Sequence, residues 1–404
     1  MLRKLLLAGA LSLSASTLAF ADCAFVNDLP LRSLTSDLEA WKAVTGAMAE
    51  CGNVEAELDP GGLNKQRAGF AADPSLYHIG SVANGSLASL LNAGVIRPLD
   101  DLVAAYGQHL SPNQLIKVDG QTMAISMMIN TQHLMYRDDI LNDLGLEVPA
   151  SYDDLIASAE IIKKEGLMDY PLGGAFESGW NLAQEFVNMY LGFGGEFFDG
   201  TGQPLINNEN GVAALLMMRR LTEYMAPDYL SLDSAHIRHQ LQQGEIAFAN
   251  LWGHHASSMD DEVESKVKGL VKMAKAPAAL PQSKPASTVW WEGIVIANNI
   301  TDDEAKAAFM VAMEGMDAEM VQTANDAAVW LIDGYEVGPL SKGVIETVIS
   351  GAASYPVSAE MGLMHKALGD GITDFMKGEK DAATTLSAIE VAYLIAAEEA
   401  GLVP

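Results

Sequence analysis

The sequence predicts an α/β protein with mostly parallel sheets flanked by helices. Hydrophobic residues make up 49% of the 404 residues and charged residues only 19%, which is typical of a globular chain with a large core. Short apolar runs typical of buried strands alternate with longer segments whose apolar residues recur at helical spacing. This alternation favours helices on both faces of each sheet, and the length indicates two or three domains.

The segment 1–21 has the features of a secretory signal. Basic residues near its start precede an apolar stretch, and 19–21 forms an A-x-A cleavage site. The predicted mature chain begins at Asp22. A lipid anchor is disfavoured because Asp22, rather than a small residue, precedes Cys23. No later stretch has the roughly 18 apolar residues of a membrane span, so we expect an exported, periplasmic protein.

The chain is strongly acidic, with a net charge of −29 that becomes −31 when the signal and its two basic residues are removed. Such a charge excludes most proteins that bind nucleic acid electrostatically. A solvated anionic surface suited to high salt explains the acidity. An acid-rich cation store is the alternative, but the sequence has no D-x-D-x-D-G loop.

Cys23 and Cys51 are the only cysteines. Because an exported chain is oxidised, we expect them to form a disulfide. In the chain-entropy model, closing this loop stabilises the fold by roughly 3.5 kcal/mol. A metal site is the weaker alternative, since no histidine lies near either cysteine in the sequence.

The first elements follow from periodicity and stop signals. A strand is expected to begin at 24–26, and 36–50 is predicted to be a helix that ends at Gly52. Trp41 lies on the apolar face of that helix and is assigned to the core. Ser111 before Pro112 indicates a helix start, and the apolar run 123–129, too short for a helix, predicts a buried strand.

Later helices carry capping signals. The S-x-x-D box at 151–154 opens a predicted helix that stops at Gly166, and the T-x-x-E box at 301–304 opens another. A buried stripe continues beyond that second box through Phe309, Met313, Met316 and Met320. The segment 276–285, rich in proline, alanine, serine and lysine, indicates a loop between lobes.

Five ordered segments carry a more specific pattern. They read NAGVIRPLDDL at 92–102, MYRDDILNDLGLEVPASYDDL at 135–155, GFGGEFFDGTGQPLINNENGVAALLMMRRL at 192–221, LQQGEIAFANLWGH at 241–254 and EGIVIANN at 292–299. In this order and at these spacings they resemble the extracellular solute-binding proteins of family 1, periplasmic components of ABC importers that include maltose-, trehalose- and glucose-type binders. Ser151-Tyr152, where the family has Thr-Trp, is a modest departure.

The resemblance implies a two-lobed periplasmic binding protein fold of the class II type, hinged around a central cleft. The expected N-terminal lobe is 22–125 plus about 286–328, and the expected C-terminal lobe is 126–285 plus about 329–404. A small molecule in the cleft and the transmembrane subunits of an ABC importer are the implied partners.

Sugar recognition needs flat aromatic faces and planar polar groups, so the scarce tryptophans are candidates. Trp252 stands where the family motif has its stacking tryptophan. Trp180 and Glu177 lie in the loop GAFESGW, where the family has an aromatic and a polar contact; an exposed acid and a packing tryptophan are the alternative. Of the neighbours Trp290 and Trp291, which must face opposite ways, Trp291 is preferred, and Trp330 is a further candidate.

Polar candidates come from the expected N-terminal lobe and the first crossing. Ser81 and Asn84 lie in GSVANGS after a predicted strand, where the family has its first ligand loop. Asn130 ends the strand near the hinge, where family members have a polar ligand contact. Asn27, Asp28 and Arg32 are expected to follow the first strand and are weaker candidates, because turn chemistry alone would explain the first two.

Histidine pairs do not predict a metal site. His254 and His255 are adjacent, so their side chains point apart, and no third ligand lies nearby in the sequence. His236 and His239 have a ligand-like spacing, but a solvated helix face explains them better. No G-x-S-x-G, H-E-x-x-H or P-loop motif indicates an enzyme.

The sequence therefore predicts a monomeric periplasmic solute-binding protein that captures a small polar ligand, a sugar first, for an ABC importer. A polyol, a phosphorylated polyol or an organic amine is the alternative ligand. An extracytoplasmic glycoside-acting enzyme is the alternative class. No catalytic residue, cofactor, metal or nucleic acid is expected.

Overall fold

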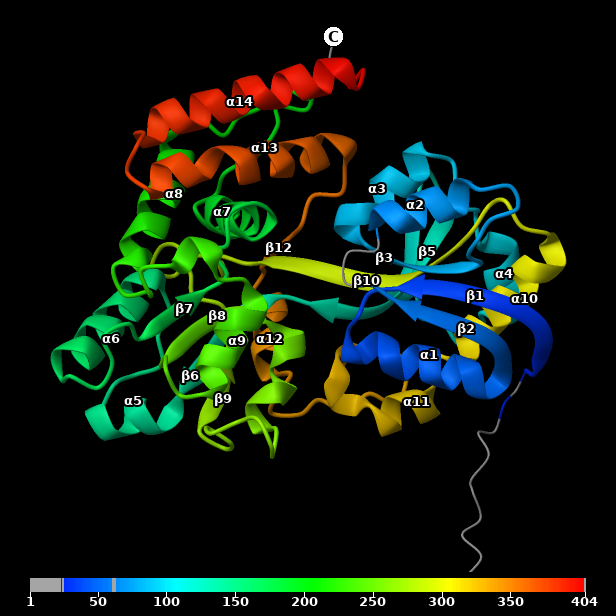
Figure 1. The fold of residues 1–404 in the computed structure, drawn as a ribbon, viewed down its shortest axis with the longest axis horizontal. Coiled ribbons are helices and arrows are strands. Elements are labelled where there is room, and N and C mark those ends of the chain that lie inside the picture. Colours follow the sequence, from blue (N-terminus) through cyan, green and yellow to red (C-terminus); the bar gives the residue numbers. More distant parts are fainter. Residues whose placement is uncertain (1–22, 24, 60–62, 403–404) are drawn as a thin grey trace, which may run out of the picture.

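Two β-sheets organise the part of the chain that the structure, a computed structural model, describes: Cys23, residues 25–59 and residues 63–402. Figure 1 shows the elements gathered around these sheets in two lobes, joined by segments that pass between them. The predicted signal segment lies outside the described residues. No helix of the described part is long and apolar enough to span a membrane.

The first lobe is built on a sheet that has eight strands among the described residues, with the order β11-β5-β10-β3-β1-β2 and with β12 on β10 and β4 on β5. Its strands are β1 (Asn27–Thr35), β2 (Gly52–Leu58), β3 (Ile79–Ala83), β4 (Leu115–Val118), β5 (Gln121–Asn130), β10 (Thr288–Ile296), β11 (Val329–Trp330) and β12 (Ala353–Ser354). Its helices are α1 (Glu39–Cys51), α2 (Leu63–Ala71), α3 (Asn84–Asn92), α4 (Asp100–Tyr106), α10 (Asp302–Glu314) and α11 (Ala318–Thr323).

The second lobe is built on a smaller sheet with the order β7-β8-β6-β9. Its strands are β6 (Gln132–Arg137), β7 (Leu172–Gly174), β8 (Phe248–Trp252) and β9 (Val271–Ala274). Its helices are α5 (Asp138–Leu144), α6 (Tyr152–Lys164), α7 (Trp180–Gly192), α8 (Glu209–Thr222), α9 (Ser234–Gln242), α12 (Lys342–Ile349), α13 (Ala359–Met376) and α14 (Ala382–Glu399).

Strand direction differs from the prediction. The pairs β1–β2, β1–β3, β10–β12 and β7–β8 are parallel, but β10 runs antiparallel to β3 and β5, and β6 runs antiparallel to β8 and β9. The expectation of mostly parallel sheets was therefore wrong. The prediction rested on helices that connect parallel neighbouring strands. Instead, β5 and β10 pair antiparallel with each other, and both lead from one lobe to the other. Figure 1 shows both strands reaching toward the second lobe.

The first strand also differs from the prediction. β1 begins at Asn27, not at 24–26, and it pairs with β2 from Asn27↔Gly52 to Thr35↔Leu58. The polar start of β1 resembles a turn, and its register is interrupted between Asn27 and Leu31, where Pro30 has no N–H to donate. Asp28 and Arg32 consequently lie within β1 rather than after it.

Several local predictions are confirmed. Ser151 caps α6 with a reciprocal capping box to Asp154, and Thr301 does the same for α10 with Glu304. The run 123–129 lies in β5. Ser111 opens only a short 3-10 turn. The predicted stripe beyond Thr301 is buried, but α10 ends at Glu314, and Met320 belongs to α11.

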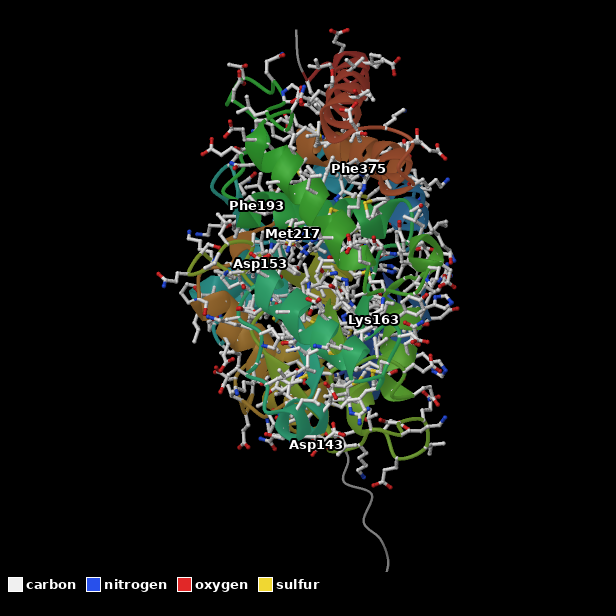
Figure 2. All side chains as sticks on the ribbon, turned by 90° about the vertical axis from the view of Figure 1, so that its left-hand side faces the viewer. Asp143, Asp153, Lys163, Phe193, Met217 and Phe375 are labelled. Carbon is white, nitrogen blue, oxygen red and sulfur yellow. A yellow bond between two sulfur atoms is a disulfide. The ribbon has the colours of Figure 1, made fainter. Side chains whose placement is uncertain are left out.

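Alternating side chains give the first lobe two cores, one on each face of its sheet. Trp41, Phe309 and Ile294 belong to the cluster on the side of α1 and α10, whereas Phe70 and Val295 belong to the cluster on the side of α2 and α3. The second lobe packs its largest cluster among α7, α8, α13 and α14. Figure 2 views this lobe from outside, with Asp153 and Lys163 toward opposite ends of α6.

The disulfide between Cys23 and Cys51 is confirmed. It connects the segment before β1 with the last residue of α1. Glu314 is close enough to form a potential metal-ligand group with the two sulfurs, but the disulfide leaves no thiolate there.

Candidate functional site

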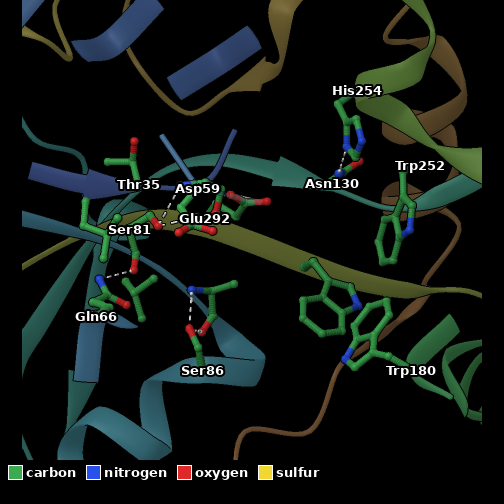
Figure 3. Close-up of a pocket in the computed structure, with 15 residues that line it drawn as sticks. Thr35, Asp59, Gln66, Ser81, Ser86, Asn130, Trp180, Trp252, His254 and Glu292 are labelled. Atoms are coloured by element: carbon green, nitrogen blue, oxygen red, sulfur yellow. Dashed lines mark hydrogen bonds between the residues drawn. The ribbon is translucent and has the colours of Figure 1, made fainter. Parts of the chain in front are cut away.

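A cavity of about 460 Å³ lies where the two lobes meet (Figure 3). Both lobes and the segments that cross between them contribute to it. Its lining consists of Leu34, Thr35, Ser36, Asp59, Gln66, Ser81, Val82, Ala83, Ser86, Asn130, Trp180, Trp252, His254, Trp290 and Glu292. The first lobe presents a mainly polar wall. Trp180 and Trp252 of the second lobe, together with Trp290 of the crossing strand β10, form an aromatic wall.

Three tryptophans form the aromatic wall. Trp180 is the first residue of α7, Trp252 the last residue of β8, and Trp290 the third residue of β10. The ring centroids are 6.4 Å apart for Trp180 and Trp252, 5.7 Å for Trp180 and Trp290, and 5.8 Å for Trp252 and Trp290. Trp180 is 50% exposed, so its ring has free area for a ligand, while the other two are nearly buried.

The structure places Trp290, and not the preferred candidate Trp291, in the lining of the cavity. Trp290 and Glu292 alternate onto the cavity side, whereas Trp291 packs against the cluster around Phe70 and Val295. Alternation along a strand predicts only that the two neighbouring tryptophans face opposite sides. Which of them faces the cavity depends on strand pairing, and in β10 Trp290 pairs with Asn130 of β5. Asn130 lines the same cavity.

The polar wall is formed largely by residues of three neighbouring strands. Thr35 ends β1, Asp59 follows β2, and Ser81 is the middle residue of β3. Because β2 and β3 both lie parallel to β1, their polar groups reach the same side of the cavity. The Ser36 N–H donates to Ser81 Oγ at 3.1 Å, and Gln66 Nε2 donates to the Ser81 carbonyl at 2.7 Å. These bonds hold the loop after β1 and helix α2 against β3.

Glu292 brings a carboxylate to the cavity from β10. Trp41 Nε1 of α1 donates to Glu292 Oε2 at 3.0 Å. Burial raises the pKa of Glu292, and the Trp41 hydrogen bond opposes that rise. Trp41 is fully buried in the core, as predicted, but it also holds a carboxylate that lines the cavity.

Asn130 and His254 join the two lobes at the cavity edge. Asn130 Oδ1 accepts from the Gly253 N–H at 2.9 Å, and Asn130 Nδ2 donates to His254 Nδ1 at 2.9 Å. Burial, and then the charge of Arg238, lowers the pKa of His254 to about 4. His254 is therefore a neutral polar group at neutral pH.

Of the predicted site residues, Ser81, Asn130, Trp180 and Trp252 line the cavity together. Asn84 lies nearby but is buried, with Nδ2 donating to the Val289 carbonyl at 3.2 Å. Glu177 accepts from Asn181 at 2.9 Å and is not among the lining residues.

Three predicted residues lie away from the cavity lining. Trp330 is buried in the first-lobe core, where Nε1 donates to the Ala324 carbonyl at 3.0 Å. Asp28 is exposed on β1. Arg32 is partly exposed and lies 3.4 Å from Glu55 and over the ring of Tyr77.

Several lining residues were not predicted from the sequence, notably Thr35, Asp59, Gln66, His254 and Glu292. Glu292 had a signal, because it is an acid within the otherwise apolar strand TVWWEGIVI. His254 stands out in the sequence only as one of two adjacent histidines, a pattern that raises the question of a metal ligand rather than of a sugar contact. Asp59 and Gln66 had no distinctive local signal, since only the fold brings them into one cavity lining with Ser81.

The described lining residues include two acids, Asp59 and Glu292, and neither a lysine nor an arginine. Lys65 lies 3.8 Å from Asp59 outside the lining. Such a cavity disfavours an anionic ligand and suits hydroxyl groups, which donate to carboxylates.

This architecture, with two α/β lobes around a shared cavity, is that of the two-lobed periplasmic binding proteins. The model of the bacterial extracellular solute-binding protein family matches residues 33–320, and the chain belongs to that family. The resemblance inferred from the five segments is thereby confirmed. The family is one of transport proteins that bind solutes, not of enzymes.

Solved structures with the same fold cover nearly the whole chain. An ABC transporter solute-binding protein from Agrobacterium radiobacter K84 in complex with ribitol is 20% identical, with a TM-score of 0.78 over 91% of this chain and 97% of that one. Maltose-bound MalE3 of T. maritima is 17% identical, with a TM-score of 0.78 over 92% and 100%. A solute-binding protein from Agrobacterium vitis S4 with D-mannitol is 17% identical, with a TM-score of 0.75 over 93% and 99%.

Proposed function

We propose that this protein binds a neutral polyhydroxylated ligand, a sugar or a polyol, in the cavity between its lobes. The observation that carries the proposal is the pairing of an aromatic wall, Trp180, Trp252 and Trp290, with carboxylates and hydroxyls on the opposite wall. The C–H face of a sugar packs on aromatic rings, while its hydroxyls need planar polar partners. The ligands printed for the similar solved structures, ribitol, maltose and D-mannitol, belong to this class.

The binding cycle follows from the two-lobed fold. The lobes, for which the sequence predicts divisions near 125, 286 and 329, rotate about the crossing segments and close on the ligand. Strand pairing places β5 and β11 with the first lobe and so favours a first crossing near Thr131. The closed protein, a monomer in the periplasm, then delivers the ligand to the transmembrane subunits of an ABC importer.

The charge of the cavity ranks the alternative ligands. A phosphorylated polyol would place its anionic group near Glu292 and Asp59 without a lysine or arginine among the described lining residues. An organic amine is the second candidate, because a cation is attracted both by these acids and by tryptophan faces. A cleft with stacking rings and several hydroxyl partners fits a sugar or a polyol better.

A thermal-shift panel tests this proposal. Neutral sugars, polyols, sugar phosphates and amines are compared with the refolded, ligand-free protein. We expect a neutral sugar or polyol to raise Tm, since a hundredfold excess over Kd stabilises by about 2.7 kcal/mol. A shift by sugar phosphates alone would contradict the proposal, and a shift by amines alone would select the second candidate. Turnover of a glycoside panel would instead indicate the enzyme alternative.

A further inference from the structure

A chain of buried polar side chains lies directly behind the aromatic wall. We call it the buried amide network and define it as Gln132, Gln184, Glu185, Asn188 and Thr288. Each of these side chains is at most 4% exposed. Polar groups buried to this extent destabilise the fold unless their hydrogen bonds are made.

Thr288 is the end of the network that touches the cavity wall. Its Oγ1 accepts from Trp290 Nε1 at 3.0 Å and from Gln184 Nε2 at 2.9 Å, and donates to Asn188 Oδ1 at 2.8 Å. A hydroxyl has one proton and two lone pairs, so these three bonds use its whole capacity. The indole of Trp290 is thus held by a fully committed partner.

The network continues from Asn188 to the first crossing between the lobes. Asn188 Nδ2 donates to Gln132 Oε1 at 2.6 Å, and Gln132 Nε2 donates to Glu185 Oε1 at 2.8 Å. Gln132 begins β6, two residues after Asn130 ends β5, and Thr288 begins β10. The network therefore bridges the two strand segments that lead from one lobe to the other.

The third support of the network is α7. Gln184, Glu185 and Asn188 all lie on this helix, whose first residue is Trp180 of the aromatic wall. The Trp180 and Trp290 rings meet edge to face. Trp290 is therefore fixed both to the crossing segments, through Thr288, and to the helix that carries its neighbour.

We infer that Thr288, backed by the buried amide network, is a positioning residue that orients Trp290 for ligand binding and links that orientation to the two crossing segments. This inference rests on the proposed function, because it assigns Trp290 a ligand contact. Thr288 itself does not line the cavity and acts through Trp290.

Thr288→Val isolates this role. Valine keeps the shape of threonine. Gln184 Nε2 and Asn188 Oδ1 keep their hydrogen bond to each other at 3.0 Å. Among the described residues, the partner of Thr288 that is left without a hydrogen bond is therefore Trp290 Nε1. The indole then turns its N–H toward another partner. Thr288→Ser keeps the hydroxyl and serves as the conservative rescue. Thr385→Val, a buried threonine at the start of α14, is the control for the general cost of such a change.

The first measurement needs no ligand. The protein is labelled with 5-fluorotryptophan, and the Trp290 fluorine resonance is assigned with Trp290→Phe. We expect Thr288→Val to shift or broaden that resonance, and Thr288→Ser and Thr385→Val to leave it near its original position. An unchanged Trp290 resonance in folded Thr288→Val overturns the inference.

The second measurement is affinity for maltose and ribitol by calorimetry. If either probe binds, Thr288→Val should raise its Kd about tenfold, and Thr288→Ser should restore most of the affinity. Equal affinity of Thr288→Val and the original protein overturns the link to binding. If neither probe binds the original protein, the proposed ligand class is weakened, while the fluorine resonance still decides whether Thr288 positions Trp290.

Discussion

At the scale of single residues, Trp252 is a candidate stacking residue of the proposed site. It ends β8, lines the cavity and packs edge to face on Trp290. Trp252→Ala should raise Kd at least tenfold, because loss of an aromatic anchor costs roughly 2 kcal/mol or more. Trp330→Ala is the matched control, since Trp330 is buried in the core away from the cavity lining. That variant should lower Tm, with a folding cost of about 3 to 5 kcal/mol, at near-normal affinity.

Calorimetric titration of both variants decides this point. Near-normal affinity in Trp252→Ala would exclude Trp252 as a stacking residue. A loss of affinity in Trp330→Ala at equal foldedness would instead return Trp330 to the site.

Trp41 gives a second prediction at this scale. Trp41→Phe keeps most of the buried volume but removes the N–H that donates to Glu292. The pKa of Glu292, already raised by burial, should rise further, so the carboxylate should protonate at a higher pH. The affinity that depends on ionised Glu292 is then lost earlier as pH falls. Kd measured between about pH 5 and about pH 8 tests this, and superimposable profiles would contradict it.

At the scale of elements, the buried amide network makes stability depend on pH. Burial raises the pKa of Glu185 from 4.5 to about 8. The folded chain therefore binds more protons than the unfolded chain between these values, and stability falls as pH rises through this window. Burial and the Glu185 charge raise the pKa of the neighbouring Tyr152, which stays neutral there. Glu185→Gln should flatten the dependence of unfolding free energy on pH, as measured by urea unfolding; an unchanged slope would contradict it.

The disulfide is the second prediction for an element. It joins residues separated by 28 positions in the sequence. The Cys23→Ser, Cys51→Ser double variant should unfold with about 3.5 kcal/mol less free energy, because its unfolded chain is less constrained. Urea unfolding of the variant beside the oxidised protein measures the difference. Identical midpoints would show that the bridge adds nothing to folding.

Local elements were predictable where one signal suffices. Ser151 and Thr301 predict the starts of their helices because a capping box lies within four residues, and an apolar run predicts β5. The orientation of Trp290 was not predictable, because it depends on pairing with β5, far away in the sequence. The roles of Asp59 and Gln66 were not predictable for the same reason, because only the fold places them in one cavity lining with Ser81.

At the scale of the whole molecule, the alternation of strands and helices predicted the α/β class, and five ordered segments predicted the family. Antiparallel pairing of β10 with β3 and β5 was not predicted, since alternation alone does not reveal which connections return directly. These crossing segments are what place residues of both lobes around one cavity. Hydrophobic periodicity alone could therefore not predict a cavity that is lined by both lobes.

Ligand binding should close the lobes. The cavity draws its lining from both lobes, so a ligand that contacts Trp180 and Ser81 together favours the closed arrangement. Solution scattering should show a smaller radius of gyration at saturating ligand. An unchanged radius at proven saturation would contradict the hinged account.

The proposed function requires that a neutral polyhydroxylated ligand bind between the aromatic and polar walls. Calorimetric titration of the refolded protein with the sugar or polyol that gives the largest thermal shift tests it most directly. We expect one site per chain, with a Kd near micromolar, about −8.2 kcal/mol, and weaker binding in both Trp252→Ala and Glu292→Gln. Binding that is unaffected by both substitutions, or no binding by any neutral sugar or polyol, would contradict it.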